Sequence, residues 1–365
     1  MPPSKATFYY VTGGNVDTYW RVEVPAKAVG GNLCLIPADR FIELVQYPHD
    51  YDPFPWRIDD EIFVHPKHEG TAVFTRPDVI RAMHALSMRE QGIRVVAEVD
   101  DNYLSKPEHN IFMRINKYGA DNRRRHLESM SVFDGVVFAT HWLRDRYHRA
   151  FRKEMKRVPE LFVARNNVDL EDWPVPVRPR SDGRLRIGYM GSAQHYRDAK
   201  LAYPALLWAA QEGHEIVFVG LDPGNTEGVT NSVALQECEA WNRLNYTHVP
   251  WVDPAEYHRV ALPFDIGLCP LEDNEHTRGK SDVKMLEYTA SGAVGVVSKH
   301  PVYKKWVDGE TALVAKTQGD FVVQLARLVN DENLRASLVA NATQYVKEER
   351  SMQKIGRDEW LQAIS

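Results

Sequence analysis

The chain lacks the features that mark secreted, disulfide-stapled and membrane-spanning proteins. Its 365 residues include 3 cysteines, and none of them lies in a CxxC pair. Cys34, Cys238 and Cys269 all lie in apolar surroundings, so we expect them to be reduced. No run approaches the ~20 consecutive apolar residues that a membrane span requires, and the N-terminus shows no signal-peptide pattern. These absences predict a cytoplasmic protein without disulfides.

Several catalytic and cofactor fingerprints are missing as well. The sequence contains no GxGxxG dinucleotide fingerprint, no Walker phosphate loop and no GxSxG nucleophile elbow. No set of His, Cys and Asp residues shows metal-ligand spacing. A dehydrogenase is therefore disfavoured, and we expect neither a metal site nor a tightly bound cofactor.

The charge that is present is unevenly spread. The formal net charge of -5 disfavours a general polyanion binder. The segment 142–158 is nevertheless rich in arginine and lysine, and apolar residues recur in it at every fourth position. That spacing predicts a helix with one apolar face. Its basic side is either a solvated surface or a patch that meets an anionic acceptor or a membrane surface.

Apolar strand-like runs alternate with helix-like segments along the whole chain, which is typical of parallel α/β layers. The expected strands are 8–12, 72–75, 93–99, 135–139, 161–164, 185–190, 215–219, 246–249, 265–268, 293–298 and 312–315. A stretch rich in proline and arginine separates the two sets. We predict two doubly wound, Rossmann-like domains, in which ligands bind beyond the carboxyl ends of the strands. The expected division is an acceptor-side domain at 1–175, a linker at 176–184, a nucleotide-sugar domain at 185–345 and a helix at 346–365 that returns toward the first domain.

The segment 277–298 carries the most informative residues of the second half. Ser281 can cap a helix there, and Lys280, Lys284 and Glu287 follow an i, i+4, i+7 spacing that puts them on one face. A helix N-terminus with two lysines suits a diphosphate. Glu287 could accept hydrogen bonds from a ribose diol. The alternative is an exposed helix face with a weak Lys284–Glu287 ion pair.

A second strand-to-helix turn lies at the start of the second half. A strand ends in Gly191 and Ser192, and His195, Arg197 and Asp198 then open a helix. Glycine lets the backbone approach a phosphate, and Arg197 could neutralise it. The same turn could be purely structural.

Two strand ends of the first half carry similar candidates. Gly13 and Gly14 follow the first strand, and Arg21 lies a turn or two later, facing either a ligand or solvent. Asp100 and Asp101 end the third strand. Adjacent carboxylates could bind sugar hydroxyls, act as a base, hold a metal or cap a helix, and we favour hydroxyl binding or a structural role.

Taken together, the ordered motifs resemble the retaining glycosyltransferases of family 4, which have the GT-B fold. The second half contains GSxxHxxD, DIGLCPL, RGKSDVKMLEY, SGAVGVVS and VDGETALV in the family's order, and the first half contains GG…YWR…PA, EVDD and RNNVD. A looser likeness joins the chain to glycosyltransferases carried by bacteriophages.

The resemblance implies a donor site mainly in the second domain. Glu287 matches the second acid of the family's EX7E motif, which binds ribose hydroxyls, whereas the first acid is replaced by Gly279. Lys280 and Arg197 match basic positions near the diphosphate, and Lys284 has a counterpart in a KSxxKxLEY subgroup. The remaining donor-side residues implied by the resemblance and the turn are Gly13, Gly14, Gly191 and Ser192.

The implied reaction is transfer with retention from a nucleotide sugar, with a UDP- or GDP-sugar preferred, and without metal. The implied catalytic residues are Lys280, Arg197 and Asp100. The acceptor is implied to lie near Asp100, Asp101, Thr140 and His141, and could be a protein, a glycan, a lipid-linked sugar or modified DNA. Two alternatives stay open, namely a nucleotide-sugar-binding module without catalysis, since Gly279 replaces an acid, and a GT-B-like sugar epimerase.

Overall fold

The structure is a computed structural model that describes most of the chain. The described residues are 6–11, 19–36, 56–58, 61–63, 70–76, 78–105, 120–173, 183–192, 195–225, 239–250 and 264–365. The predicted glycine loop Gly13–Gly14 and nearly all of the predicted linker 176–184 lie outside them.

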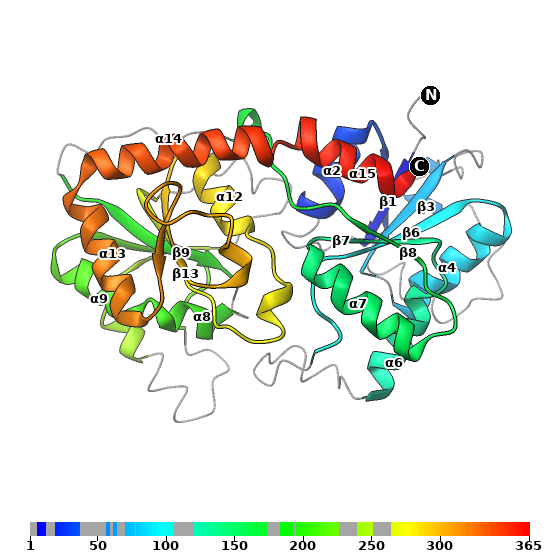
Figure 1. Ribbon diagram of the computed structural model, residues 1–365, viewed down its shortest axis with the longest axis horizontal. Helices are drawn as coiled ribbons and strands as arrows, with labels where there is room; N and C mark the ends of the chain where they lie inside the picture. Colours follow the sequence, from blue (N-terminus) through cyan, green and yellow to red (C-terminus); the bar gives the residue numbers. More distant parts are fainter. Residues whose placement is uncertain are drawn as a thin grey trace.

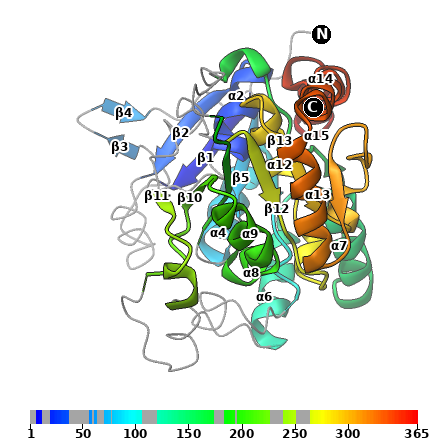
Figure 2. The same cartoon turned by 90° about the vertical axis from the view of Figure 1, so that its left-hand side faces the viewer.

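The first half of the chain forms a six-stranded parallel sheet with the order β2-β1-β5-β6-β7-β8. Its strands are β1 (Ala6–Val11), β2 (Asn32–Ile36), β5 (Thr71–Thr75), β6 (Arg94–Val99), β7 (Gly135–Phe138) and β8 (Glu160–Val163). Its helices are the π-helical turn η1 (Tyr19–Glu23), α2 (Val24–Val29), α4 (Val79–Glu90), α6 (Ala120–Met130) and α7 (His141–Glu154), followed by the 3-10 turn η2 (Leu170–Asp172). A separate antiparallel pair, β3 (Trp56–Ile58) and β4 (Glu61–Phe63), stands apart from both main sheets (Figure 2).

The second half repeats the design with the order β11-β10-β9-β12-β13-β14, again all parallel. Its strands are β9 (Arg186–Gly191), β10 (Glu215–Gly220), β11 (Thr247–Val249), β12 (Ile266–Cys269), β13 (Val294–Ser298) and β14 (Leu313–Ala315). Its helices are α8 (Tyr196–Leu201), α9 (Tyr203–Gln211), α12 (Val283–Ala290), α13 (Gln318–Asn330) and α14 (Glu332–Glu349), with 3-10 turns η4 (Thr277–Gly279) and η5 (Pro301–Tyr303). The two sheets lie side by side (Figure 1).

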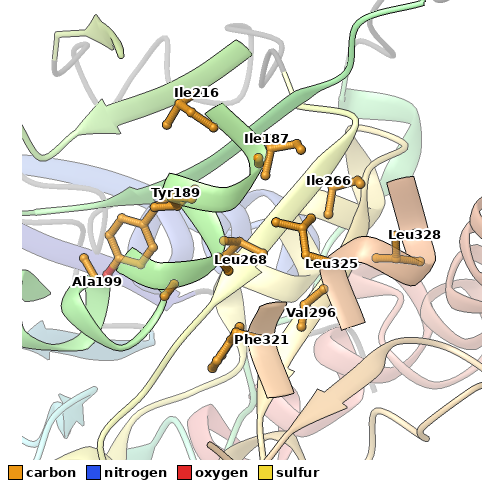
Figure 3. Close-up of a cluster of buried hydrophobic side chains, with 14 of the residues drawn as sticks. Ile187, Tyr189, Ala199, Ile216, Ile266, Leu268, Val296, Phe321, Leu325 and Leu328 are labelled. Atoms are coloured by element: carbon orange, nitrogen blue, oxygen red, sulfur yellow. The ribbon is translucent and has the colours of Figure 1, made fainter. Parts of the chain in front are cut away.

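The central strands are continuous apolar runs because helices cover both faces of each parallel sheet. One side of the second sheet packs on α13 through Phe321, Leu325 and Leu328, which contact side chains of β9, β12 and β13 (Figure 3). The predicted strands agree with the observed ones to within one or two residues. The prediction missed β2, at the edge of its sheet, and the antiparallel pair β3–β4. The basic helix predicted at 142–158 is α7, and it ends four residues earlier, at Glu154.

The end of the chain crosses from the second half to the first. Helix α14 runs along one side of the molecule, and the π-helical turn η6 (Met352–Gly356) leads into α15 (Arg357–Ile364) beside α2 (Figure 1). Trp360 of α15 is fully buried and packs edge-on against Phe8 of β1, with ring centroids 5.5 Å apart. Thr71 Oγ1 of β5 donates to the Ile364 carbonyl at 2.6 Å. The last helix is thus part of the first half's core.

Candidate functional site

Helix α12 carries Lys284 and Glu287, and the strands beneath it determine how closely it packs. Gly267 of β12 lies under the Tyr288 ring, where a Cβ atom would be 2.4 Å from the ring. Gly295 of β13 lies under Met285, where a Cβ atom would be 2.2 Å from the sulfur. Any larger residue at either position would push the helix off the sheet. The glycines of DIGL and AVGVV therefore let α12 pack closely on β12 and β13.

The N-terminus of α12 differs in detail from the prediction. The helix is preceded by Asp282, whose side chain makes no capping hydrogen bond, and Ser281 does not cap it either. Ser281 Oγ instead accepts a hydrogen bond from Asn166 Nδ2 of the first half at 2.8 Å. Asp282 is buried and accepts from Trp306 Nε1 at 2.8 Å and from the guanidinium of Arg350. Both side chains therefore bind partners distant in sequence instead of the N–H groups at the start of the helix.

Glu287 lies a turn into α12, and it is only 1% exposed. Its Oε1 accepts a hydrogen bond from Trp20 Nε1 at 3.1 Å. Trp20 belongs to η1 of the first half and packs on Tyr19 and Trp173. The carboxylate that the spacing assigned to the ribose is therefore held by an indole from the other half of the chain.

Lys284 projects from the first turn of α12 over the ring of Tyr189, with Nζ 5.6 Å from the ring centroid. Among the described residues, no carboxylate lies within ion-pair distance of Nζ, so the alternative of an exposed Lys284–Glu287 ion pair is wrong. Burial lowers the pKa of Lys284, with Asp198 opposing that effect. A half-buried cation without a bonded carboxylate is well suited to bind an anion.

His195 and Asp198 form a second polar group beside Lys284. They lie at the start of α8, just after β9, and His195 Nδ1 is 2.8 Å from Asp198 Oδ2. The other carboxylate oxygen accepts from the backbone N–H of Glu272 at 2.9 Å. Burial, together with Lys284 and Lys280, lowers the pKa of His195 to about 4, against the opposing effect of Asp198. His195 is therefore neutral at pH 7, and the hydrogen bond of Asp198 fixes the orientation of its ring.

Lys280 lies between η4 and α12, and it reaches the first half. Its Nζ donates to Asp101 Oδ2 at 2.7 Å. His276 lies beside the same carboxylate, with Nε2 3.8 Å from Asp101 Oδ1. Lys280 and His276 hold the pKa of Asp101 well below its usual range, against the effect of burial. This contact joins the end of β6 to the loop after β12, so the carboxyl edges of the two sheets meet here.

The other acceptor-side candidates lie nearby but do not form one cluster. Asp100 accepts from Arg76 at 3.0 Å and from the Tyr103 hydroxyl at 3.1 Å. Thr140 caps α7 by accepting from the Leu143 N–H, and its hydroxyl lies 3.4 Å from the Gly279 carbonyl. His141 is exposed at the first position of the same helix. Asp101 and Thr140 therefore contact the second half, whereas Asp100 bonds within the first.

Gly279, which occupies the position of the family's first acid, is buried against the first half. A Cβ atom there would lie 2.9 Å from Leu143 Cδ2 and 3.0 Å from Asn102 Cβ. Asn102 Nδ2 also donates to the Glu275 carbonyl at 3.0 Å, on the same loop. The space that an acidic side chain would need at position 279 is filled by side chains of the other half.

Several predicted donor-side residues lie elsewhere. Arg197 is exposed on α8 and makes no hydrogen bond to the described residues, so it lies apart from the His195–Asp198 pair. Gly191 ends β9 and Ser192 follows it, both half-buried. Gly13 and Gly14 lie outside the described residues, as noted above.

Arg21 is buried at 1% exposure, although the sequence left open whether it faces a ligand or solvent. Its Nε donates to Glu98 Oε1 at 2.6 Å, and its Nη1 donates to the Ala164 carbonyl and to Asn166. Burial raises the pKa of Glu98 to about 7, while Arg21 opposes that rise. Arg21 thus holds the ends of β6 and β8 together beneath the site.

Sequence reasoning missed three residues that shape the site. They are Arg350 at the end of α14, Trp20 and His276. The sequence assigned them no role, because their partners lie far away in the chain. Arg350 and Asp282 are separated by 68 residues, and Trp20 and Glu287 by 267. The only signal was their place in charged or aromatic surroundings, which does not identify a partner.

The part of the chain that the structure describes holds no group of three or more His, Cys, Asp or Glu residues that could bind a metal ion. Within those same ranges, no helix is long and apolar enough to cross a membrane.

Comparisons with known proteins agree with the observed fold. Residues 206–358 match the model of a family described as glycosyl transferase-like. A comparison with curated proteins finds no match. Solved structures similar to the chain include HepE from Anabaena in complex with UDP-glucose, with a TM-score of 0.64 at 13% identity over 98% of both chains. A UDP-forming α,α-trehalose-phosphate synthase from Burkholderia xenovorans gives a TM-score of 0.61 at 14% identity, covering 100% of this chain and 98% of that one. Sucrose-phosphate synthase from Thermosynechococcus elongatus gives 0.57 at 13% identity over 97% of both.

Proposed function

We propose that this chain, whose two facing parallel sheets give it the GT-B fold of those structures, is a glycosyltransferase that uses a nucleotide-diphosphate sugar. One observation carries the proposal. Lys280 precedes α12, Lys284 and Glu287 lie on its first turn and a half, and Lys280 contacts Asp101 where the carboxyl edges of the two sheets meet. HepE was solved with UDP and glucose and with UDP-glucose, so we rank UDP-sugars first among donors and GDP-sugars second.

The donor would bind with its diphosphate at the start of α12. The helix N-terminus offers free N–H groups and a positive dipole end, and Lys284 adds a cation that has no bonded carboxylate among the described residues. Lys280 can exchange Asp101 for a phosphate oxygen, because a lysine is a flexible point charge. Glu287 would receive the ribose hydroxyls, which requires Trp20 to share or release its oxygen. In this scheme the exposed Arg197 contacts the donor only if the donor extends toward α8.

The proposed reaction proceeds with retention, as in family 4. The bond from the sugar's anomeric carbon to the diphosphate breaks, and the acceptor oxygen bonds to that carbon on the same face. The acceptor's proton passes to the departing phosphate oxygen. Lys280, Lys284 and the helix end stabilise the negative charge that develops on the leaving group, so no metal ion is needed for that task.

The acceptor would lie on the loops of the first half. Asp100 and Asp101 follow β6, and Thr140 and His141 begin α7, all at the carboxyl edge of the sheet. Asp100 is already oriented by Arg76 and Tyr103, so it can accept a hydrogen bond from an acceptor hydroxyl. We propose a division of the chain at the segment 176–184 and, from the reduced and buried Cys269, a cytoplasmic location.

The first test is a thermal-shift screen against UDP-, GDP-, dTDP- and ADP-sugars. A donor present at about 100 times its Kd stabilises the folded state by about 2.7 kcal/mol, which is readily measured. We expect a selective shift with one nucleotide. The absence of a shift with every donor would contradict the proposal.

Paired variants then locate the site. Lys284→Ala should weaken binding of the donor by about 10- to 100-fold, because a hydrogen bond to a charged group is lost. Lys305→Ala, at an exposed lysine after η5, is the matched control and should leave affinity unchanged. Transfer measured with EDTA should persist, and a loss that Mg²⁺ or Mn²⁺ restores would exclude the metal-free scheme.

A second candidate is a nucleotide-sugar-binding module without transfer activity. Gly279 favours it, because the acid expected there is absent and its space is filled by Leu143 and Asn102. Donor binding without sugar release to water or to any acceptor, even at high enzyme concentration, would favour this candidate over the transferase.

A further inference from the structure

The His195–Asp198 pair is the polar group beside the proposed donor site that the scheme above does not use. His195 begins α8 directly after β9, whose carboxyl end points at the same edge as α12. Asp198 is 6% exposed, and both of its oxygens are bonded, one to His195 and one to the Glu272 N–H. A buried carboxylate that is fully satisfied in this way holds the imidazole in one orientation.

The hydrogen bond also determines which ring nitrogen is available. Asp198 is ionised, because His195 and the Glu272 N–H hold its pKa below the usual range against the effect of burial. The proton of the neutral imidazole therefore lies on Nδ1, facing the carboxylate. Nε2 is left with a lone pair and has no hydrogen-bonding partner among the described residues. This nitrogen can gain a proton and then donate.

We propose that His195, held by Asp198, is a third basic group of the donor site, which takes up a proton from solvent when the diphosphate of a nucleotide sugar binds and donates it to a phosphate oxygen. The inference rests on the proposed donor function. It adds a residue and a proton-uptake step that neither lysine provides. No covalent bond forms or breaks, and the only transfer is of one proton from water to Nε2.

The electrostatics of the surroundings explain why binding would cause the uptake. The charged groups that act on His195 are Asp198 on its own helix, Lys284 on α12 and Lys280 before α12. Asp198 also acts on two other histidines, the half-buried His276 on the loop after β12 and the buried His300 after β13, and opposes the lowering of their pKa values by burial. Without a ligand, burial and the two lysines keep the pKa of His195 at about 4. A diphosphate brings two negative charges that offset the lysines.

The size of the effect follows from Coulomb's law. One negative charge about 5 Å from the ring, at an effective dielectric constant of about 20, is enough to raise a histidine pKa by about two. The pKa of His195 is thus raised in the bound state relative to the free state. By linkage, donor affinity increases as the pH falls through the bound-state pKa, and it levels off below the free-state pKa of about 4.

The test is isothermal titration calorimetry with UDP-glucose at pH 6, in buffers of different ionisation enthalpy. UDP-glucose is a better probe than UDP. Its diphosphate is esterified at both ends and carries no group that titrates near neutrality, whereas the terminal phosphate of UDP does. The dependence of the observed enthalpy on the buffer gives the number of protons taken up per site. We expect about 0.5 to 1 proton for the wild-type chain, and affinity that weakens several-fold from pH 6 to pH 8.

Three variants separate His195 from its neighbours. His195→Gln should bind UDP-glucose with lower affinity, take up no protons and show a flat pH profile over this range. Lys284→Arg keeps a charge that does not titrate and should retain the uptake. His276→Gln, at a half-buried histidine on the loop after β12, should also retain it. Histidine NMR of the wild-type chain gives the same answer without any substitution, since one ring should shift from neutral to protonated on binding.

The outcomes distinguish a failure of the proposed donor function from a failure of the proposed role of His195. If no nucleotide sugar binds, the proposed donor function fails. If UDP-glucose binds with no proton uptake, or if the uptake survives in His195→Gln, the donor function stands and the inference about His195 is wrong.

Discussion

Two charged contacts at the junction of the halves differ in a way that separates structure from function. Arg350 and Asp282 are buried, with side chains 5% and 10% exposed, and Arg350 also donates to the Asn166 carbonyl and the Asn167 side chain. Lys280 and Asp101 are 22% and 18% exposed, and a hydrogen bond of 2.7 Å joins them. The first contact is planar, forked and enclosed, whereas the second is a single flexible bond near solvent.

The comparison shows what each contact can do. Asp282 binds the guanidinium through both oxygens and Trp306 through one of them, so it has no capacity left for a ligand. Lys280 can exchange Asp101 for a phosphate, because its ammonium is a flexible point charge that has an anionic partner in either state. We therefore interpret the Arg350 contact as a structural link between the halves and the Lys280 contact as a site that exchanges partners. Four substitutions test that interpretation.

Arg350→Ala should have the largest effect on stability. Removing one member of a buried ion pair leaves Asp282 uncompensated and should lower the free energy of unfolding by about 3–5 kcal/mol. Urea unfolding followed by circular dichroism measures it. Lys347→Ala, at an exposed position on the same helix, is the control and should change stability by less than about 0.5 kcal/mol. An equal, small effect of both substitutions would show that the contact is not a structural link.

Gly279→Glu, which restores the family's first acid, should have the second largest effect on stability. Its Cβ would lie 2.9 Å from Leu143 and 3.0 Å from Asn102, so the halves must separate locally at a cost of about 1–3 kcal/mol. We expect lower stability and no gain in donor affinity. Gly319→Glu is the matched control, because the nearest atom to a Cβ there is 3.7 Å away. Increased transfer activity in Gly279→Glu would contradict the view that this position now serves packing.

Lys280→Ala should affect binding far more than stability. Loss of the partly exposed Lys280–Asp101 pair should change the free energy of unfolding by less than about 1 kcal/mol. Loss of the cation should weaken donor binding by about 10-fold or more, as titration calorimetry would show. Asp101→Asn separates the two roles of the contact, since it removes the competing carboxylate and should not weaken binding. If Lys280→Ala destabilises the fold as much as Arg350→Ala, the two contacts are alike after all.

Lys27→Ala should have the smallest effect and provides a baseline. Lys27 and Asp172 form an exposed pair with side chains 64% and 39% exposed. We expect the free energy of unfolding to change by less than about 0.5 kcal/mol. The melting temperature of the variant should depend on salt in nearly the same way as that of the wild-type chain. A larger loss would mean that the contact between α2 and η2 carries more of the fold than its exposure suggests.

The sequence predicted the strands well because continuous apolar runs are a local property. Runs such as VVAEV and GYM end at residues that do lie at the carboxyl edges, including Asp100 and Gly191. It predicted the shared face of Lys284 and Glu287 for the same reason, since the helical period places them there. It erred on Ser281 as a cap, because Asn166, more than a hundred residues away, binds that hydroxyl.

What the sequence determined by itself was therefore the class of fold, the order of its strands along the chain, and the residue types that end them. Apolar periodicity and short motifs encode those features locally. Only the tertiary structure decided that Trp20 holds Glu287, that Asp101 pairs with Lys280, and that the space at Gly279 is filled from the other half. It also decided that Arg197 is exposed while His195 faces Asp198. These outcomes depend on which groups are desolvated together, and burial and charge pairing are properties of the folded chain alone.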